Sequence, residues 1–214
     1  MPEPMTDLDD MRKYSNALRL TAEKRADELS VALTEGSITL EAWTEGMRET
    51  IREAHALQFV TGKGGDRSLI DFKEYLQLGS PVARQYRFLA KFVADVEAAI
   101  DAGGSLGFVR NRSKMYAKAS QAMFWHSAVP VKIPQVPRDG KTRCRTNCKC
   151  RLEIKREIDK DGNLVILVWW KLSPAEHCPD CVKLAREWNP LRLVAGVAEA
   201  SDFESSLYLI ENVA

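Results

Sequence analysis

The sequence lacks any run of 18 or more apolar residues, so we expect no transmembrane helix. It lacks the HExxH and GxxxxGK[ST] motifs, and no H-x-E motif accompanies Cys178-Pro-Asp-Cys181. These absences argue against a zinc protease, a P-loop nucleotide-binding protein and a zinc deaminase. Only His55, His126 and His177 are present as histidine bases, and none lies in a catalytic motif. We therefore expect no enzymatic activity and no small-molecule substrate.

Neither sign of charge dominates the chain, because 31 lysines and arginines balance 30 aspartates and glutamates. The segment Met1–Asp7 is acidic and polar, which leads us to expect no secretory signal and reducing, cytoplasmic surroundings. Residues 138–156 carry eight basic side chains against only Asp139 and Glu153. This segment is either a nucleic-acid contact or a solvated surface. Its candidate contact residues are Arg143, Arg145, Lys149 and Arg151.

No cysteine precedes Cys144, and all five cysteines then fall between Cys144 and Cys181. They form two groups, Cys144-Arg-Thr-Asn-Cys-Lys-Cys150 and His177-Cys-Pro-Asp-Cys181. Between the groups, the pattern predicts a β-hairpin with strands over 151–159 and 164–170 and a turn at 161–163. The hairpin would bring the two groups together, as in a small tetrahedral zinc site. Disulfides and reduced, buried cysteines remain as alternatives.

The candidate zinc ligands are Cys144, Cys148, Cys150, Cys178 and Cys181. The CxxC pair, Cys178 and Cys181, is the first choice; Cys150 and Cys144 follow, and Cys148 is the expected spare. His177 is a possible substitute for one of the sulfurs. A catalytic zinc needs an open coordination position, whereas sulfur alone can fill this site. We therefore predict one structural zinc ion that holds a module too small to build its own core.

Helical periodicity dominates the residues before the cysteines. We predict helices over 6–35, from Ser37 or Thr39 to about Val60, over 69–78, from Gly79 to Gly103 and from Ser105 to about Ser127. The helix after Gly79 is apolar over so wide an arc that we expect it to lie centrally. Thr61–Gly65 is interpreted as a flexible connection, because no apolar strand leads into it. We expect His55 to be a packed core residue.

Prolines at 130, 134 and 137 predict a stiff, extended linker over 129–140. The predicted fold is α+β and mainly α. A helical domain of long antiparallel helices (1–128) precedes the linker, a cysteine-rich hairpin module (141–190) and a C-terminal tail (191–214). Within the tail, 201–212 is compatible with either a helix or a strand. Since the linker would separate two cores, we expect chelation to melt the hairpin and leave the helices largely intact.

Several short segments occur in a characteristic order. They are Gly36-Ser-Ile-Thr-Leu-Glu-Ala-Trp43, His55-Ala-Leu-Gln-Phe-Val-Thr-Gly-Lys-Gly-Gly65, Arg84-Gln-Tyr86, Arg112-Ser-Lys-Met-Tyr116 and the two cysteine groups. Over roughly residues 35–185, this order resembles the tailed-phage minor head proteins of the Mu F-like head morphogenesis group. A terminal CxC is the most recognisable mark of that family. The His-Pro that usually precedes it is replaced here by Lys141-Thr-Arg143.

The resemblance implies a non-enzymatic component of the virion or procapsid, in the capsid interior or at the portal vertex. Such a protein is assembled in the host cytoplasm and acts in head assembly and DNA packaging or delivery. The implied partners are the portal, the major capsid protein or both, with DNA as a further candidate and no membrane. The alternative hypothesis is a zinc-dependent nucleic-acid-binding protein that uses the basic hairpin segment 138–156.

Overall fold

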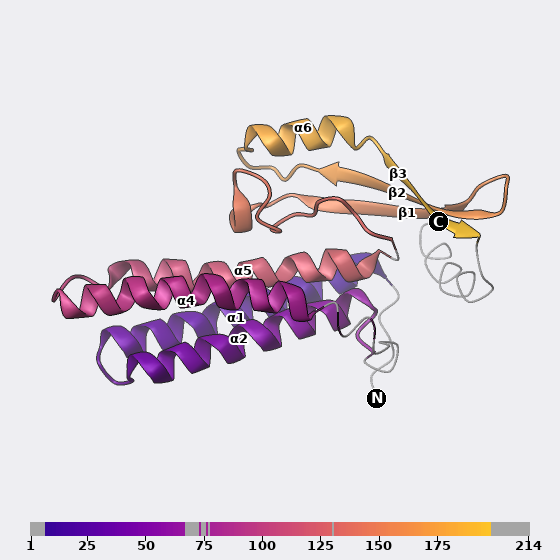
Figure 1. The fold of residues 1–214 in the computed structure, drawn as a ribbon. Coiled ribbons are helices and arrows are strands. Elements are labelled where there is room, and N and C mark those ends of the chain that lie inside the picture. The colour runs from indigo at the N-terminus through magenta and orange to yellow at the C-terminus, as the bar shows by residue number, and fades with distance from the viewer. Residues whose placement is uncertain (1–6, 67–72, 74–75, 77, 130, 198–214) are drawn as a thin grey trace.

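The computed structural model describes residues 7–66, 73, 76, 78–129 and 131–197. The predicted helix over 69–78 falls largely, and the segment 201–212 entirely, outside these described residues. The fold is α+β and mainly α, as predicted (Figure 1). Four long helices form a bundle, and a small antiparallel sheet with one short helix lies over it (Figure 1). No helix in the described part of the chain has the length and apolarity to span a bilayer.

Local sequence signals set the bounds of the first helices. Helix α1 (Leu8–Thr34) begins where the Asp7 carboxylate accepts hydrogen bonds from the amides of Asp9 and Asp10. Helix α2 (Leu40–Gly62) begins at Thr39, whose hydroxyl accepts a hydrogen bond from the Ala42 amide. Such side-chain acceptors satisfy amides that have no partner within the helix. Gly36, with φ of 71°, allows the reversal between the two helices.

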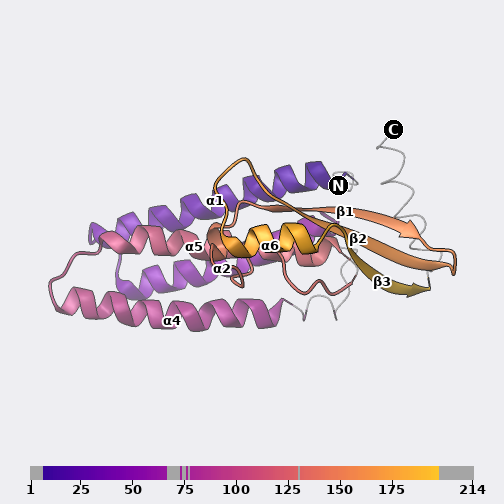
Figure 2. The ribbon, with the colours of Figure 1, turned by 90° about the horizontal axis from the view of Figure 1, so that it is seen from above.

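The central helix is not the one that we predicted. Helix α4 (Gly79–Asp101) buries only Leu89, Phe92 and Val96 and lies at the edge of the bundle (Figure 2). Helix α5 (Gly107–Ala128) packs against both α1 and α2 and is buried on most of its surface. The small residues of α5 let neighbouring helices approach closely. A search for apolar stripes overlooks such a helix, because alanine and serine contribute little to the apolar pattern. The expectation of a central Gly79 helix was therefore wrong.

Gly62 is a packing residue rather than part of a loose connection. It ends α2 against α5, and a Cβ atom there would lie 2.4 Å from the Phe124 carbonyl oxygen and 2.9 Å from the Ala128 nitrogen. Backbone atoms cannot move aside as a flexible side chain can. The glycine therefore permits the contact between the ends of two helices, while Gly64 and Gly65, both with positive φ, form the turn that follows.

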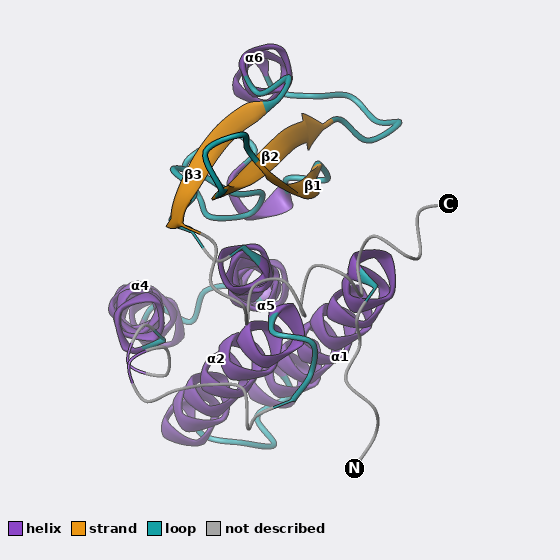
Figure 3. Cartoon of the chain, turned by 90° about the vertical axis from the view of Figure 1, so that its right-hand side faces the viewer, coloured by secondary structure: helices purple, strands orange, loops and turns teal. Residues whose placement is uncertain are grey.

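The sheet has the order β1-β2-β3, and its strands are β1 (Arg151–Ile158), β2 (Asn163–Lys171) and β3 (Leu191–Val197). The predicted hairpin is present, with Leu152 opposite Trp170 and Ile158 opposite Leu164. Strand β3 was not predicted: residues 191–197 had been placed in the tail, yet they pair antiparallel with β2. The sheet lies between α5 and α6 (Pro179–Glu187) (Figures 1 and 3).

The predicted linker is packed into the molecule. Val129, Ile133 and Val136 are each at most 4% exposed, and they join one apolar cluster with Phe124 of α5 and Ile166 of β2. A separate apolar cluster lies among α1, α2, α4 and α5. The helices therefore have a core of their own, whereas the apolar cluster of the sheet includes side chains from α5 and the linker.

Candidate metal centre

Two separate segments supply the five sulfurs. Cys144 and Cys148 flank the single-turn 3-10 helix η2 (Arg145–Asn147), and Cys150 directly precedes β1. Cys178 is the N-cap of α6, and Cys181 lies in its first turn. Pro179 favours a helix start at this point, because the first helical residue needs no amide hydrogen. Arg151 pairs with Lys171 at the open end of the hairpin, so the start of β1 lies beside the end of β2. This pairing brings the two cysteine segments together.

Three of the sulfurs form a compact cluster. The Sγ atoms of Cys144, Cys148 and Cys181 lie within 4.8 Å of one another, so these residues can hold a metal ion. The Cys181 Sγ lies 3.6 Å from that of Cys144 and 3.7 Å from that of Cys148. A tetrahedron with metal–sulfur bonds of about 2.3 Å has edges of about 3.8 Å. The sulfur spacing therefore fits a tetrahedral thiolate site.

Cys178 and Cys150 each contact a member of this cluster. The Cys178 Sγ is 3.6 Å from the Cys144 Sγ. The Cys150 Sγ lies 3.7 Å from His177 Nδ1, while His177 Nε2–H donates to the Ser173 carbonyl at 2.6 Å. The order of preference among the sulfurs therefore differs from that predicted. Cys148, the expected spare, is within the cluster, whereas Cys150 contacts both Cys148 and His177.

The protonation of the thiols reflects their crowding. Burial raises the pKa of Cys144 to about 11. A hydrogen bond with the Cys150 thiol, together with burial, raises the pKa of Cys148, and burial with the neighbouring Cys148 raises that of Cys181. Burial also acts to raise the pKa of Cys178, but hydrogen bonds from the backbone at Cys181 and Cys144 outweigh it and lower this pKa to about 7.

Two residues beside the cluster were not predicted from the sequence. The Thr142 hydroxyl lies 3.2 Å from the Cys144 Sγ, and the Asp180 carboxylate accepts a hydrogen bond from the Arg143 amide at 2.7 Å. The contact with Asp180 ties the first cysteine segment to α6. Thr142 is close to Cys144 in the sequence, but nothing in the sequence pairs Asp180 with Arg143, since they are brought together only by the fold.

The candidate nucleic-acid residues differ in their surroundings. The Arg143 side chain pairs with Asp180. Lys149 and Arg151 are exposed around Cys150, whereas Arg145 in η2 points into a cavity beside α4 and α5. The basic segment 138–156 is thus divided between the hairpin surface and the helix-facing side of the preceding loop.

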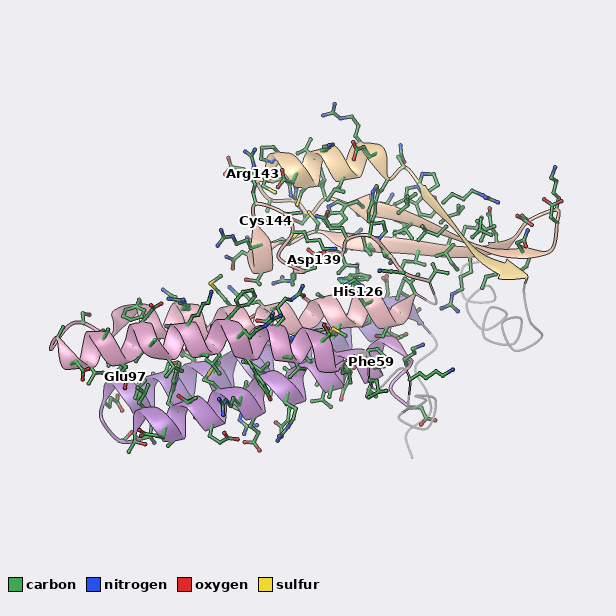
Figure 4. All side chains as sticks on the ribbon, viewed as in Figure 1. Phe59, Glu97, His126, Asp139, Arg143 and Cys144 are labelled. Atoms are coloured by element: carbon green, nitrogen blue, oxygen red, sulfur yellow. The ribbon has the colours of Figure 1, made fainter. Side chains whose placement is uncertain are left out.

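The histidines have separate environments. His55 is buried, as expected for a packed core residue, and its Nδ1 hydrogen-bonds to the Ile51 carbonyl at 2.8 Å. His126 lies on α5 on the side facing the linker (Figure 4), and only His177 lies near the sulfurs. Comparison of the chain with protein-family profiles, curated proteins and solved structures gave no match.

Proposed function

We infer that the cysteine cluster binds one structural zinc ion, which fastens η2 to the start of α6. The distances of 3.6 and 3.7 Å between sulfurs on these two segments carry this inference. Uncharged thiols gain little stability from such close contact. Thiolates that share a bound cation, in contrast, are strongly stabilised by it. Zinc would deprotonate the thiols on binding, and its folding contribution would be local to the module.

Cys178 is the fourth ligand in this proposal. It shares a CxxC pair with Cys181, and its sulfur lies at a tetrahedral edge distance from Cys144. Cys150 instead hydrogen-bonds to His177, beside the site. Four sulfurs leave no open coordination position, so the ion would serve structure rather than catalysis.

Metal content tests this proposal. The chain purified without added chelator should contain about one zinc ion, and Cys178→Ser/Cys181→Ser should lose it. Cys150→Ser is the matched control, because it removes a neighbouring thiol and should retain the metal. Retention in the double variant, or loss in Cys150→Ser, would contradict the assigned ligand set. A metal-free chain with reduced cysteines would overturn the zinc site itself.

For the biological role, we propose a minor head protein of a tailed phage or prophage, acting without chemistry of its own near the portal. The support is the order of the helical segments from Gly36 to Tyr116 together with the two cysteine groups. The long helices would offer a rigid surface to the portal or capsid protein, and the zinc module would present a second surface.

Purified heads and procapsids provide the test of this role. The protein should sediment with procapsids in few copies, and its deletion should reduce head assembly or DNA packaging. The Cys178→Ser/Cys181→Ser variant should reproduce part of this defect, since it disturbs the module and leaves the helical core in place. Absence of the protein from heads, with normal assembly after its deletion, would refute the proposal.

A further inference from the structure

A cavity of about 810 Å³ lies between α4, α5 and the loop that follows the linker. Helix α4 forms one wall, α5 forms the floor, and residues 138–141 with part of η2 form the other wall. Figure 4 shows two of its residues, His126 on α5 and Asp139 on the loop, in the space between the helices and the sheet. Cavities of this size hold small organic ligands.

The charge of the cavity is strongly one-sided. Six cationic side chains from three separate segments line it, against the single carboxylate of Asp139. That carboxylate is already engaged, since it accepts hydrogen bonds from the Val136 and Lys141 amides. The cations are Arg84, Lys91, Arg112, Arg138, Lys141 and Arg145. The protein is nearly neutral overall, but six of its cationic side chains lie at one concave site. Such a cluster raises the local concentration of anions.

Several of these cations lack a protein partner. Arg112 pairs with Asp95, and the Arg138 Nη1 donates to the Thr146 carbonyl. Among the described residues, in contrast, no ion pair or side-chain hydrogen bond engages Arg84, Lys91 or Arg145. Like charges placed together repel one another, and an anion between them removes that repulsion.

The backbone of the loop wall is unusual as well. Arg138 and Arg145, with φ of 72° and 49°, are the two non-glycine residues of the described chain in the left-handed region. Both line the cavity. Non-glycine residues rarely adopt this conformation without a compensating role, and such strain concentrates at functional sites. Here it directs two arginines of one loop toward the same cavity.

The remaining surface of the cavity is apolar. Phe88 on α4 is 50% exposed although it is a large aromatic residue, and Tyr116, Met115 and Met123 on α5 add further apolar surface. Arginine recognises phosphate through paired N–H donors, and aromatic faces stack on planar rings. A nucleotide carries both a phosphate group and a planar ring, so it matches both kinds of surface.

We propose that this cavity binds a phosphate-bearing ligand of nucleotide size, with the arginines on its phosphates and Phe88 against its ring. The phosphate can come from a free nucleotide or from a nucleic-acid strand. The site goes beyond the proposed zinc centre, because five of its six cations lie outside the cysteine segments. The loop between Cys144 and Cys148 contributes only part of one wall, through Arg145 and Thr146.

Calorimetric titration at low salt tests the site, with the full metal-loaded chain and ATP, pyrophosphate or a short single-stranded DNA as probes. ATP should bind with one-to-one stoichiometry, and Arg84→Gln should weaken binding at least about tenfold. Arg87→Gln is the matched control, because it removes the same charge from α4 at an exposed position outside the cavity, and its affinity should stay near that of the wild type. Phe88→Ala should weaken ATP binding and leave pyrophosphate binding unchanged.

The probes distinguish the sources of the phosphate. Binding of ATP that DNA does not displace identifies a free nucleotide, while tighter, competing binding of DNA identifies a strand; either result supports the site. No binding of any probe at low salt would overturn the proposal. Equal weakening by Arg84→Gln and Arg87→Gln would also overturn it, because it would show nonspecific attraction. The zinc content of each variant is unaffected by these outcomes, so the two proposals fail separately.

Discussion

The helical bundle and the sheet differ in what holds them together. In the bundle, the Phe92 ring lies 5.5 Å from Trp43 and 6.2 Å from Tyr116, and the buried side chains all come from the helices themselves. The buried side chains of the sheet instead share a cluster with α5 and the linker. The bundle thus has a core built from its own helices, whereas the sheet buries its apolar side chains against a neighbouring surface.

This difference shows how a small module can be fixed to a larger one. A three-stranded sheet has too little apolar surface to be stable alone. One set of contacts, around Ile133 and Val136, attaches it to α5. The cysteine segments form a second set of contacts within the module itself, between η2 and α6.

Removing the proposed zinc ion should produce the largest difference between the two regions. Structural zinc contributes on the order of 10 kcal/mol in small modules, so chelation should abolish hydrogen-exchange protection in β1 and β2. Amides of α2 should remain protected. Because α5 shares an apolar cluster with the sheet, the melting temperature of the bundle should nevertheless fall when the sheet unfolds. Simultaneous loss of protection in α2 and β2 would show that the two regions unfold as one unit.

Substituting Gly62 should disturb the bundle in turn. Gly62→Ala should destabilise it by roughly 3 kcal/mol, because the new methyl group would overlap backbone atoms of α5. Gly79→Ala is the control: a Cβ atom there meets nothing within 4 Å, so stability should be unchanged or slightly higher. Denaturant unfolding measures both. Equal stabilities for the two variants would mean that α2 and α5 do not approach as closely as described.

A smaller effect should follow from acidification, and it should arise in the bundle. Burial lowers the pKa of His55 to about 4, below its ordinary value of 6.5. The unfolded chain therefore takes up a proton that the folded chain does not, and stability falls as the pH falls from 6.5 toward 4. Between pH 6.5 and 5, the wild type should lose roughly 1.5 kcal/mol more than His55→Gln.

The comparison with His55→Gln isolates this histidine, because any release of the proposed zinc ion would affect both proteins alike. Unfolding free energies at a series of pH values provide the measurement. Parallel pH profiles for the two proteins would contradict a neutral, buried His55.

The sequence by itself determined the helices, the hairpin and the grouping of the cysteines. Asp7 and Thr39 cap helices through their own side chains, and the turn before Asn163 follows from local residue preferences. The spacing of the cysteines also predicted that the two cysteine groups meet, and three of the five sulfurs form one cluster. These features depend on interactions within a few residues, or on the period of apolar side chains, and both can be recognised along the chain.

Only the tertiary structure decided which helix is central, which sulfurs cluster and where the basic residues lie. Ser30 and Ser113, for example, are buried in a mutual hydrogen bond of 2.9 Å between α1 and α5, although serine contributes nothing to an apolar pattern. Strand β3 likewise forms because β2 offers it an edge. Cys148 joins the cluster, and Arg84 meets Arg145 across a cavity, because distant segments pack together. Such contacts depend on three-dimensional complementarity, which local periodicity does not encode.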